Sequence, residues 1–184
     1  MRIPPVEAAD ADKQVQKVYD TLEKAYGTAL NPLRTMAYKP QMMRAVMTLY
    51  GAIHAPNPNL SEELKELVSI RVSQINGCRH YCVPYHTLQA KKHGATDAKI
   101  AAVAQARNST VLSDLEKLAI EYAERITVPS MVVTDEFFDR LREFLDDADI
   151  VELTAVISFM NFWSKTIDAL DIPLDEVFAE VAPH

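Results

Sequence analysis

Five residues of the types used in thiol chemistry lie between positions 66 and 86: Glu66, Cys78, His80, Cys82 and His86. Cys78 and Cys82 are the two cysteines of the chain. A thiolate is a far better nucleophile than a thiol, so this chemistry requires a base and an electropositive environment. A second thiol can then close the cycle by forming a disulfide. The set therefore favours redox chemistry on a cysteine thiolate.

The residues after Cys82 indicate how its thiol could be activated. Proline lacks an N–H and belongs in the first turn of a helix, so Pro84 predicts a helix that begins near Cys82. The amides and the positive dipole end of that helix would stabilise a Cys82 thiolate. His86 follows by one helical turn and can accept the thiol proton, while Glu66 on the preceding helix can orient the imidazole.

The spacing of the two cysteines sets a condition on disulfide formation. The Cβ atoms of a disulfide lie about 3.5–4.5 Å apart, whereas residues i and i+4 of a regular helix lie roughly 5–6 Å apart. Cys78 must therefore lie outside the regular helix. Gly77, which follows Asn76, and Pro84 bracket the segment in a way that predicts this break. We expect a disulfide only if residues 78–81 are non-helical.

Length and composition describe one globular domain of ordinary hydrophobicity. The chain has 184 residues, 48% of them hydrophobic, and a net charge of −7, which argues against non-specific binding to nucleic acid. No apolar signal segment follows Met1, and the longest apolar stretch, 150–163, contains Glu152 and is too short for a bilayer. We therefore expect a cytoplasmic protein without membrane contact, in which two nearby cysteines indicate metal binding or redox catalysis.

Helical periodicity runs through the whole chain, and no strand pattern competes with it. The sequence predicts a single all-α domain over residues 1–184, a bundle of roughly eight to ten helices behind an extended arm of about residues 1–9. Ser61 and Ser113 are expected to cap helices. The main expected helices cover about 10–26, 61–75, 82–93, 96–107, 113–127, 134–145 and 149–170, with a short helix after Pro173.

The sequence around the two cysteines, and parts of the chain after it, resemble the alkylhydroperoxidase D (AhpD)-like branch of the carboxymuconolactone decarboxylase family. The resemblance covers most of residues 35–175, and its sharpest motif is confined to 66–86. It implies an all-α fold and a homo-oligomer (trimer, hexamer or dimer). The residues that carry it are Glu66-Leu67-Val68, Gln74-Ile75-Asn76-Gly77-Cys78-Arg79-His80-Tyr81-Cys82-Val83-Pro84-Tyr85-His86 and the later Val133-Thr134-Asp135, Ile150-Val151-Glu152-Leu153, Asn161-Phe162 and Asp168-Ala169-Leu170.

The resemblance also implies roles for the five residues. Cys82 would attack a small-molecule peroxide and Cys78 would resolve the product, while Glu66 and His86 relay the proton and His80 assists. A thiol or dithiol would donate electrons, and no cofactor is implied. The family motif has two residues between its cysteines, whereas this chain has three. The spacings from Glu66 to Cys78 and from Cys82 to His86 match the family, so the difference is one inserted residue between the cysteines.

Two other functions fit part of the pattern. Zinc could bind Cys78, Cys82 and His86, with His80 or Glu66 as a fourth ligand, although no second cysteine pair completes the usual zinc motif. A non-redox lyase of the decarboxylase type is the other alternative.

The other histidines are expected at the protein surface; they are His54, His93 and His184. A run of large apolar residues is expected to form core or a subunit interface; it consists of Phe159, Met160, Phe162 and Trp163.

Overall fold

The structure, a computed structural model, describes residues 1–181, and its helices are joined by turns and irregular segments. Within this range the chain forms nine α-helices and three short 3-10 helices and contains no strand, which confirms the all-α fold. The elements are η1 (Ala8–Asp10), α1 (Lys13–Tyr26), α2 (Asn31–Met36), α3 (Pro40–Ile53), α4 (Glu62–Ile75), α5 (Cys82–Lys92), α6 (Asp97–Ala102), η2 (Val103–Asn108), α7 (Asp114–Thr127), α8 (Asp135–Arg142), α9 (Asp147–Leu170) and η3 (Glu176–Val181).

Local capping explains most of the boundaries. The Ser61 hydroxyl accepts from Leu64 N–H at the start of α4, and Ser113 forms a capping box with Glu116 at the start of α7. Two expected boundaries are wrong. Helix α1 starts later than residue 10, because Asp12 caps it. The helix expected over 96–107 divides into α6 and η2, and non-helical backbone at Gln105 kinks η2.

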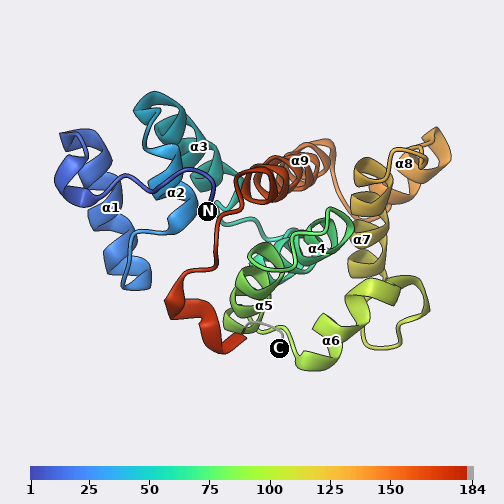
Figure 1. Cartoon of the computed structure of the whole chain (residues 1–184). Coiled ribbons are helices and arrows are strands. Elements are labelled where there is room, and N and C mark those ends of the chain that lie inside the picture. Colours follow the sequence, from blue (N-terminus) through green and yellow to red (C-terminus); the bar gives the residue numbers. More distant parts are fainter. Residues whose placement is uncertain (182–184) are drawn as a thin grey trace.

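Helix α4 occupies the centre of the molecule. It packs against α5, α7 and α9, while α1, α2 and α3 lie at one end of the fold and α8 lies at the other (Figure 1). Leu67, Val68 and Val72 of α4 are completely buried. Because neighbours cover this helix on several sides, polar residues on it are also withdrawn from water, and α4 becomes the natural support for a buried site.

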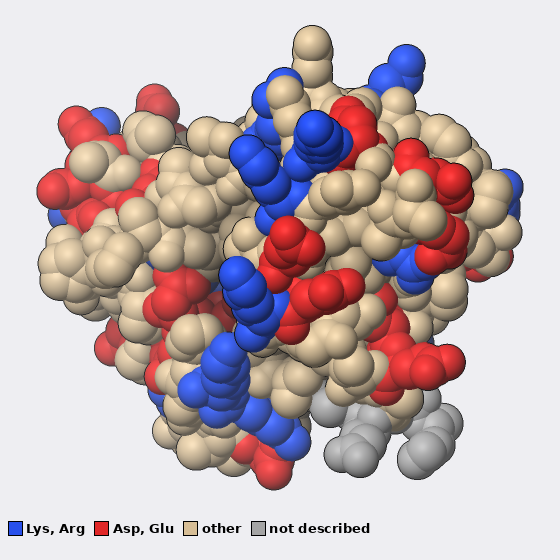
Figure 2. Space-filling model, turned by 90° about the vertical axis from the view of Figure 1, so that its left-hand side faces the viewer, with Lys and Arg blue, Asp and Glu red and all other residues tan. Residues whose placement is uncertain are grey.

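The surface mixes charges of both signs. On the face shown in Figure 2, Lys and Arg side chains form a broken band with acidic side chains among them. Ion pairs between side chains of opposite sign include Arg34–Glu7 and Lys91–Asp97. No helix among the described residues combines the length and apolar character needed to cross a membrane.

The aromatic run on α9 is mostly core. Phe159 is 6% exposed and Met160 is 4% exposed, whereas Phe162 remains 40% exposed beside the partly buried Trp163. The run therefore contributes one large apolar side chain to the surface rather than a continuous patch. The expected homo-oligomer stays a prediction.

The chain reverses direction between α4 and α5 through a Schellman motif. Gly77 has a φ of +78°, in the left-handed region that favours glycine. Cys78 N–H donates to Ser73 C=O at 3.0 Å, and Gly77 N–H donates to Gln74 C=O at 3.3 Å. These two bonds satisfy the last carbonyls of α4 and fix the position of Cys78 directly after the turn.

Replacing Gly77 with alanine should destabilise the protein. A Cβ at Gly77 would contact nothing within 4 Å, so the cost is the left-handed backbone itself, about 1–2 kcal/mol. Urea unfolding should show a lower midpoint with an unchanged slope. Gly51→Ala is the matched control, because Gly51 lies inside α3 with equally open space and alanine should raise stability there. A midpoint for Gly77→Ala equal to that of the wild type would contradict this account.

Candidate active site

The two cysteines meet across the turn that precedes α5. Residues 78–81 are non-helical, and Cys82 is the first residue of the helix. The two thiols are free and buried, and their sulfur atoms lie 2.8 Å apart. The structural condition for a disulfide is thus met, despite the three residues between the cysteines. Formation of the disulfide itself stays a prediction.

The first amide of α5 donates a hydrogen bond to the first cysteine of the pair. Cys82 N–H donates to Cys78 Sγ at 3.4 Å, because a side chain that precedes a helix can accept from its first free amides. The hydrogen bond between the two thiols, together with backbone donors, lowers the pKa of Cys78. The hydrogen bond between Cys82 and Cys78, together with burial, raises the pKa of Cys82. The pKa of Cys82 is therefore raised on balance, contrary to the lowered pKa expected from its place at the helix start.

Glu66 and His86 form a buried pair between α4 and α5. His86 Nδ1 lies 2.6 Å from Glu66 Oε2, and the two side chains are 10% and 4% exposed. This contact fixes the orientation of the imidazole, since the ring's other nitrogen must then point away from Glu66. The structure thus brings together the two residues expected to form a proton relay. It contains no hydrogen bond from His86 to Cys82 within the described part of the chain.

A cavity of about 260 Å³ adjoins these residues. Cys82 and His86 lie in its wall, whereas Cys78 does not, so Cys82 is the sulfur that a bound molecule would meet. Most of the remaining wall is apolar or aromatic. The Tyr26 and Tyr85 hydroxyls are 3.2 Å apart and supply polar atoms there. Tyr50, Phe159 and Trp163 complete the aromatic part of the wall.

One expected site residue, His80, and the alternative zinc ligand set are not brought together by the fold. His80 is exposed on the turn and does not line the cavity, so the structure does not bring it to the other four residues. Among the described residues, the ligand atoms of Cys78, Cys82 and His86 do not form a metal-ligating cluster. The alternative of a zinc site at these three residues therefore lacks ligand atoms close enough to share one ion.

Other site residues lay outside the sequence-based expectation. His54, expected at the surface, has a side chain only 13% exposed and lies 2.6 Å from Glu62, whereas His93 is exposed as expected. His184 lies outside the described residues. The i, i+4 spacing of Glu62 and Glu66 on one helix was a signal for this cluster, but nothing in the sequence placed His54 beside them.

The segment after α9 fastens the turn that carries the cysteines. Tyr81 O–H donates to Asp175 Oδ2 at 2.7 Å, and Asn31 N–H donates to Asp175 Oδ1 at 2.9 Å. Burial raises the pKa of the Asp175 carboxyl. Asp175 therefore links the cysteine turn to α2 and to the C-terminal segment, a role that its position in the sequence did not indicate.

Comparison with known proteins agrees with this architecture. The pattern of the carboxymuconolactone decarboxylase family matches residues 40–125. The uncharacterised protein YnjA of Escherichia coli K12 is 32% identical over 148 residues, which cover 80% of this chain and 81% of YnjA. The chain belongs to the carboxymuconolactone decarboxylase family. Glu66, Cys78, Cys82 and His86 all lie within the segment that matches the family.

Solved structures show the AhpD-like form of the family fold. A peroxidase-related protein with an alkylhydroperoxidase AhpD core from Ralstonia eutropha JMP134 has a TM-score of 0.86 at 21% identity, covering 99% of this chain and 96% of its own. The debrominase Bmp8 has a TM-score of 0.79 at 22% identity, covering 97% and 94%. At these identities the likeness establishes a shared fold.

Titration of the thiols should show that Cys78 depends on Cys82. In Cys82→Ala the Cys78 thiol loses the hydrogen bond that contributes most to its lowered pKa, so that pKa should rise. The ultraviolet absorbance of the thiolate, followed against pH, measures this shift. Cys78→Ala is the converse variant: the Cys82 pKa should fall towards its ordinary value, while burial still holds it above that value. An unchanged Cys78 titration in Cys82→Ala would show that the two sulfurs do not share a proton.

Proposed function

We propose that this protein is a thiol-dependent peroxidase in which Cys82 attacks the peroxide and Cys78 resolves the product. The observation that carries the proposal is the placement of the two sulfurs. They lie 2.8 Å apart, and only Cys82 lines the cavity. The Cys82 thiol can therefore contact a substrate, while the Cys78 thiol lies next to it outside the cavity wall. Membership of the family and the peroxidase-related structural neighbour support this assignment.

The shared proton explains how a cysteine with a raised pKa can act. The first proton leaves the pair, and the charge is favoured on Cys78, where the helix amide and the Cys82 thiol stabilise it. Transfer of the remaining proton across 2.8 Å makes Cys82 the thiolate when substrate is present. His86, held by Glu66, accepts the first proton and carries it as imidazolium.

The reaction consumes one peroxide and two thiols. The Cys82 thiolate attacks the outer oxygen of R–O–OH, the O–O bond breaks, and Cys82 becomes a sulfenic acid. The leaving alkoxide takes the proton from His86 and departs as an alcohol. Cys78 then attacks the sulfenic sulfur, which forms the disulfide and releases water. A thiol or dithiol donor reduces the disulfide, and the reducing cytoplasm is the compartment we propose for this cycle.

The cavity favours a peroxide with an apolar organic group. Its lining is largely aliphatic and aromatic, with Tyr50, Phe159 and Trp163 among the wall residues. Burying apolar substrate surface there contributes about 25 cal/mol per Å², a gain that hydrogen peroxide cannot provide. An organic hydroperoxide is therefore the substrate class that this wall fits best.

A second candidate uses the same thiols on a halogenated aromatic compound. The debrominase Bmp8 shares the fold and has been solved with 2,3,4-tribromopyrrole. The aromatic wall beside Cys82 is the feature of this chain that favours such a ligand. Two thiols would replace a carbon–bromine bond with a carbon–hydrogen bond, forming the disulfide and hydrogen bromide. Bromide release separates this candidate from peroxide reduction, and a non-redox lyase would leave both thiols reduced.

Mass spectrometry of the intact protein tests the proposal. After one equivalent of cumene hydroperoxide, the reduced protein should lose two hydrogen atoms and become resistant to alkylation at both cysteines. Hydrogen peroxide should produce the same species more slowly. Cys78→Ser should instead stop with one added oxygen on the Cys82 peptide, because no resolving thiol remains. Thiols that stay reduced under these conditions, or oxygen added to Cys78 first, would overturn the assignment.

Glu66→Gln should slow thiol oxidation without unfolding the protein. Glutamine keeps the size of the side chain but cannot stabilise an imidazolium at His86, and loss of such acid–base assistance costs about 10²–10⁴-fold in rate. Glu63→Gln is the matched control, since Glu63 lies on the same helix and pairs with Lys99. The measurement is the rate of thiol loss with cumene hydroperoxide. Equal rates for Glu66→Gln and Glu63→Gln would remove the relay from the mechanism.

A further inference from the structure

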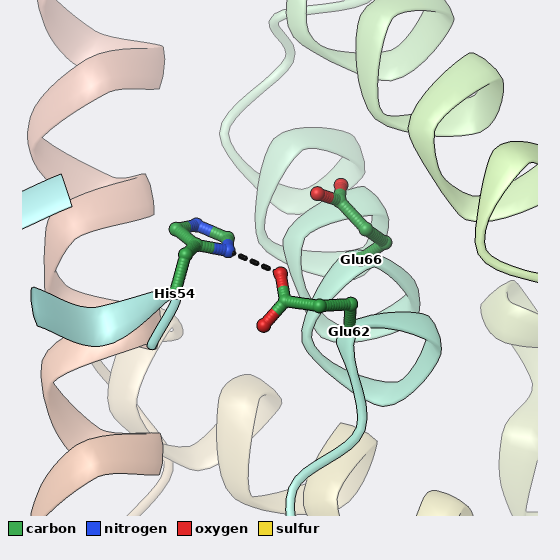
Figure 3. Close-up of side chains that lie close together, drawn as sticks. All are labelled: His54, Glu62 and Glu66. Atoms are coloured by element: carbon green, nitrogen blue, oxygen red, sulfur yellow. Dashed lines mark hydrogen bonds and ion pairs between the residues drawn. The ribbon is translucent and has the colours of Figure 1, made fainter. Parts of the chain in front are cut away.

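Three possible metal ligands converge where the end of α3 meets α4. His54 directly follows α3, and Glu62 and Glu66 lie one turn apart on α4. One ligand atom of each residue lies within 4.8 Å of the other two. Figure 3 shows the His54 ring against the Glu62 carboxylate, with the Glu66 carboxylate one turn further along the same side of the helix. The cluster is formed by side chains from two separate helices.

The carboxylates are held in place by residues behind them. Glu66 is 3% exposed, and its Oε2 contacts His86 Nδ1, but within the described residues its Oε1 has no hydrogen-bond donor. Glu62 Oε1 accepts from the buried Lys65 ammonium at 2.9 Å, which leaves Oε2 facing His54. Glu66 thus has one oxygen held by His86, whereas Glu62 has one oxygen held by Lys65 and the other in contact with His54. Partners of this kind orient the ligands in protein metal sites.

Three carboxylates and one ammonium lie around the cluster. Lys65 is fully buried and pairs with Glu62 at 2.9 Å and with Glu152 at 2.8 Å. The carboxylates of Glu62, Glu66 and Glu152 share this one ammonium and the imidazoles of His54 and His86. A divalent cation bound among them would be attracted by the carboxylates that face it.

We propose that His54, Glu62 and Glu66 bind one divalent transition-metal ion of the Zn²⁺ type. One imidazole nitrogen and two carboxylate oxygens form a ligand set that Zn²⁺ accepts, at about 2.0–2.2 Å, and three protein ligands leave a position for water or substrate. The cation takes the place of the proton shared by His54 Nδ1 and Glu62 Oε2. His54 also lines the cavity, so the site lies at its edge.

Zn²⁺ titration of a thiol-free protein tests the site directly. The Cys78→Ser/Cys82→Ser protein removes the competing thiolates, and isothermal titration should give one equivalent of bound Zn²⁺. Mg²⁺ should bind far more weakly, because it prefers an all-oxygen octahedral shell. His54→Ala and Glu62→Gln should each weaken Zn²⁺ binding by at least about tenfold, the lower end of the cost of losing even a supporting partner.

Two control variants separate this site from adventitious binding. Glu63→Gln changes the neighbouring residue on α4, which pairs with Lys99, and His93→Ala removes an exposed histidine. Both should leave Zn²⁺ affinity unchanged. Absence of Zn²⁺ binding, or affinity lost with His93→Ala rather than with His54→Ala, would overturn the proposal. Circular dichroism of each variant confirms that it is folded before titration.

The reduced wild-type protein provides a second measurement that does not depend on the double variant. Co²⁺ bound by nitrogen and oxygen should give visible absorption without the near-ultraviolet band of cobalt–thiolate bonds, and His54→Ala should abolish that absorption. A thiolate band would place the metal at the cysteines and overturn the assignment. The measurement involves no peroxide, so its outcome is independent of the proposed peroxidase reaction.

Discussion

The hydrogen bond from Cys78 N–H to Ser73 C=O determines the geometry on which the site depends. It ends α4, and with Gly77 in the left-handed region it turns the chain so that α5 packs back along α4. This return places His86 beside Glu66, which lies two turns before the end of α4. The same reversal keeps Cys78 out of a helix while Cys82 begins one. A single capping arrangement thereby positions both the thiol pair and the acid–base pair.

Helix α4 carries ionisable groups into the centre of the protein, and their pairing makes this possible. Lys65 is completely buried, yet its ammonium contacts Glu62, Glu152 and the carbonyl of Ala55. An unpaired ion at such a position would cost several kcal/mol, whereas a paired and hydrogen-bonded one is tolerated. Glu152 comes from α9, so the network also fixes how α9 lies against α4. The packing of α9 against α4 and the charge beside the cavity therefore depend on the same ion pairs of Lys65.

The sequence predicted the architecture well because its signals were local. Ser61, Ser113, Gly77 and Pro84 act on their immediate neighbours, so helix boundaries and the break at the cysteines could be inferred from spacing alone. The Glu66–His86 pair followed from helical periodicity and the resemblance to the family.

The errors arose where three-dimensional placement decides the chemistry. The start of a helix near Cys82 was correctly located, but which sulfur accepts its amide depends on the path of residues 78–81. His54 follows a helix and precedes a Pro-rich loop, a position typical of the surface, and only the packing of α3 against its neighbours withdraws it from water. Asp175 reaches Tyr81 across 94 residues of sequence.

The wall of the cavity also contains the chain's single tryptophan. Trp163 stands edge-on to Phe159 and borders the same space as Cys82 and His86. The tryptophan fluorescence of this protein consequently originates at one place, and that place is the site. A molecule that enters the cavity, or a change in the ionisation of the groups around it, alters the surroundings of the only indole. Trp163 is thus an intrinsic fluorescent probe of the cavity, because no other tryptophan in the sequence contributes to the emission.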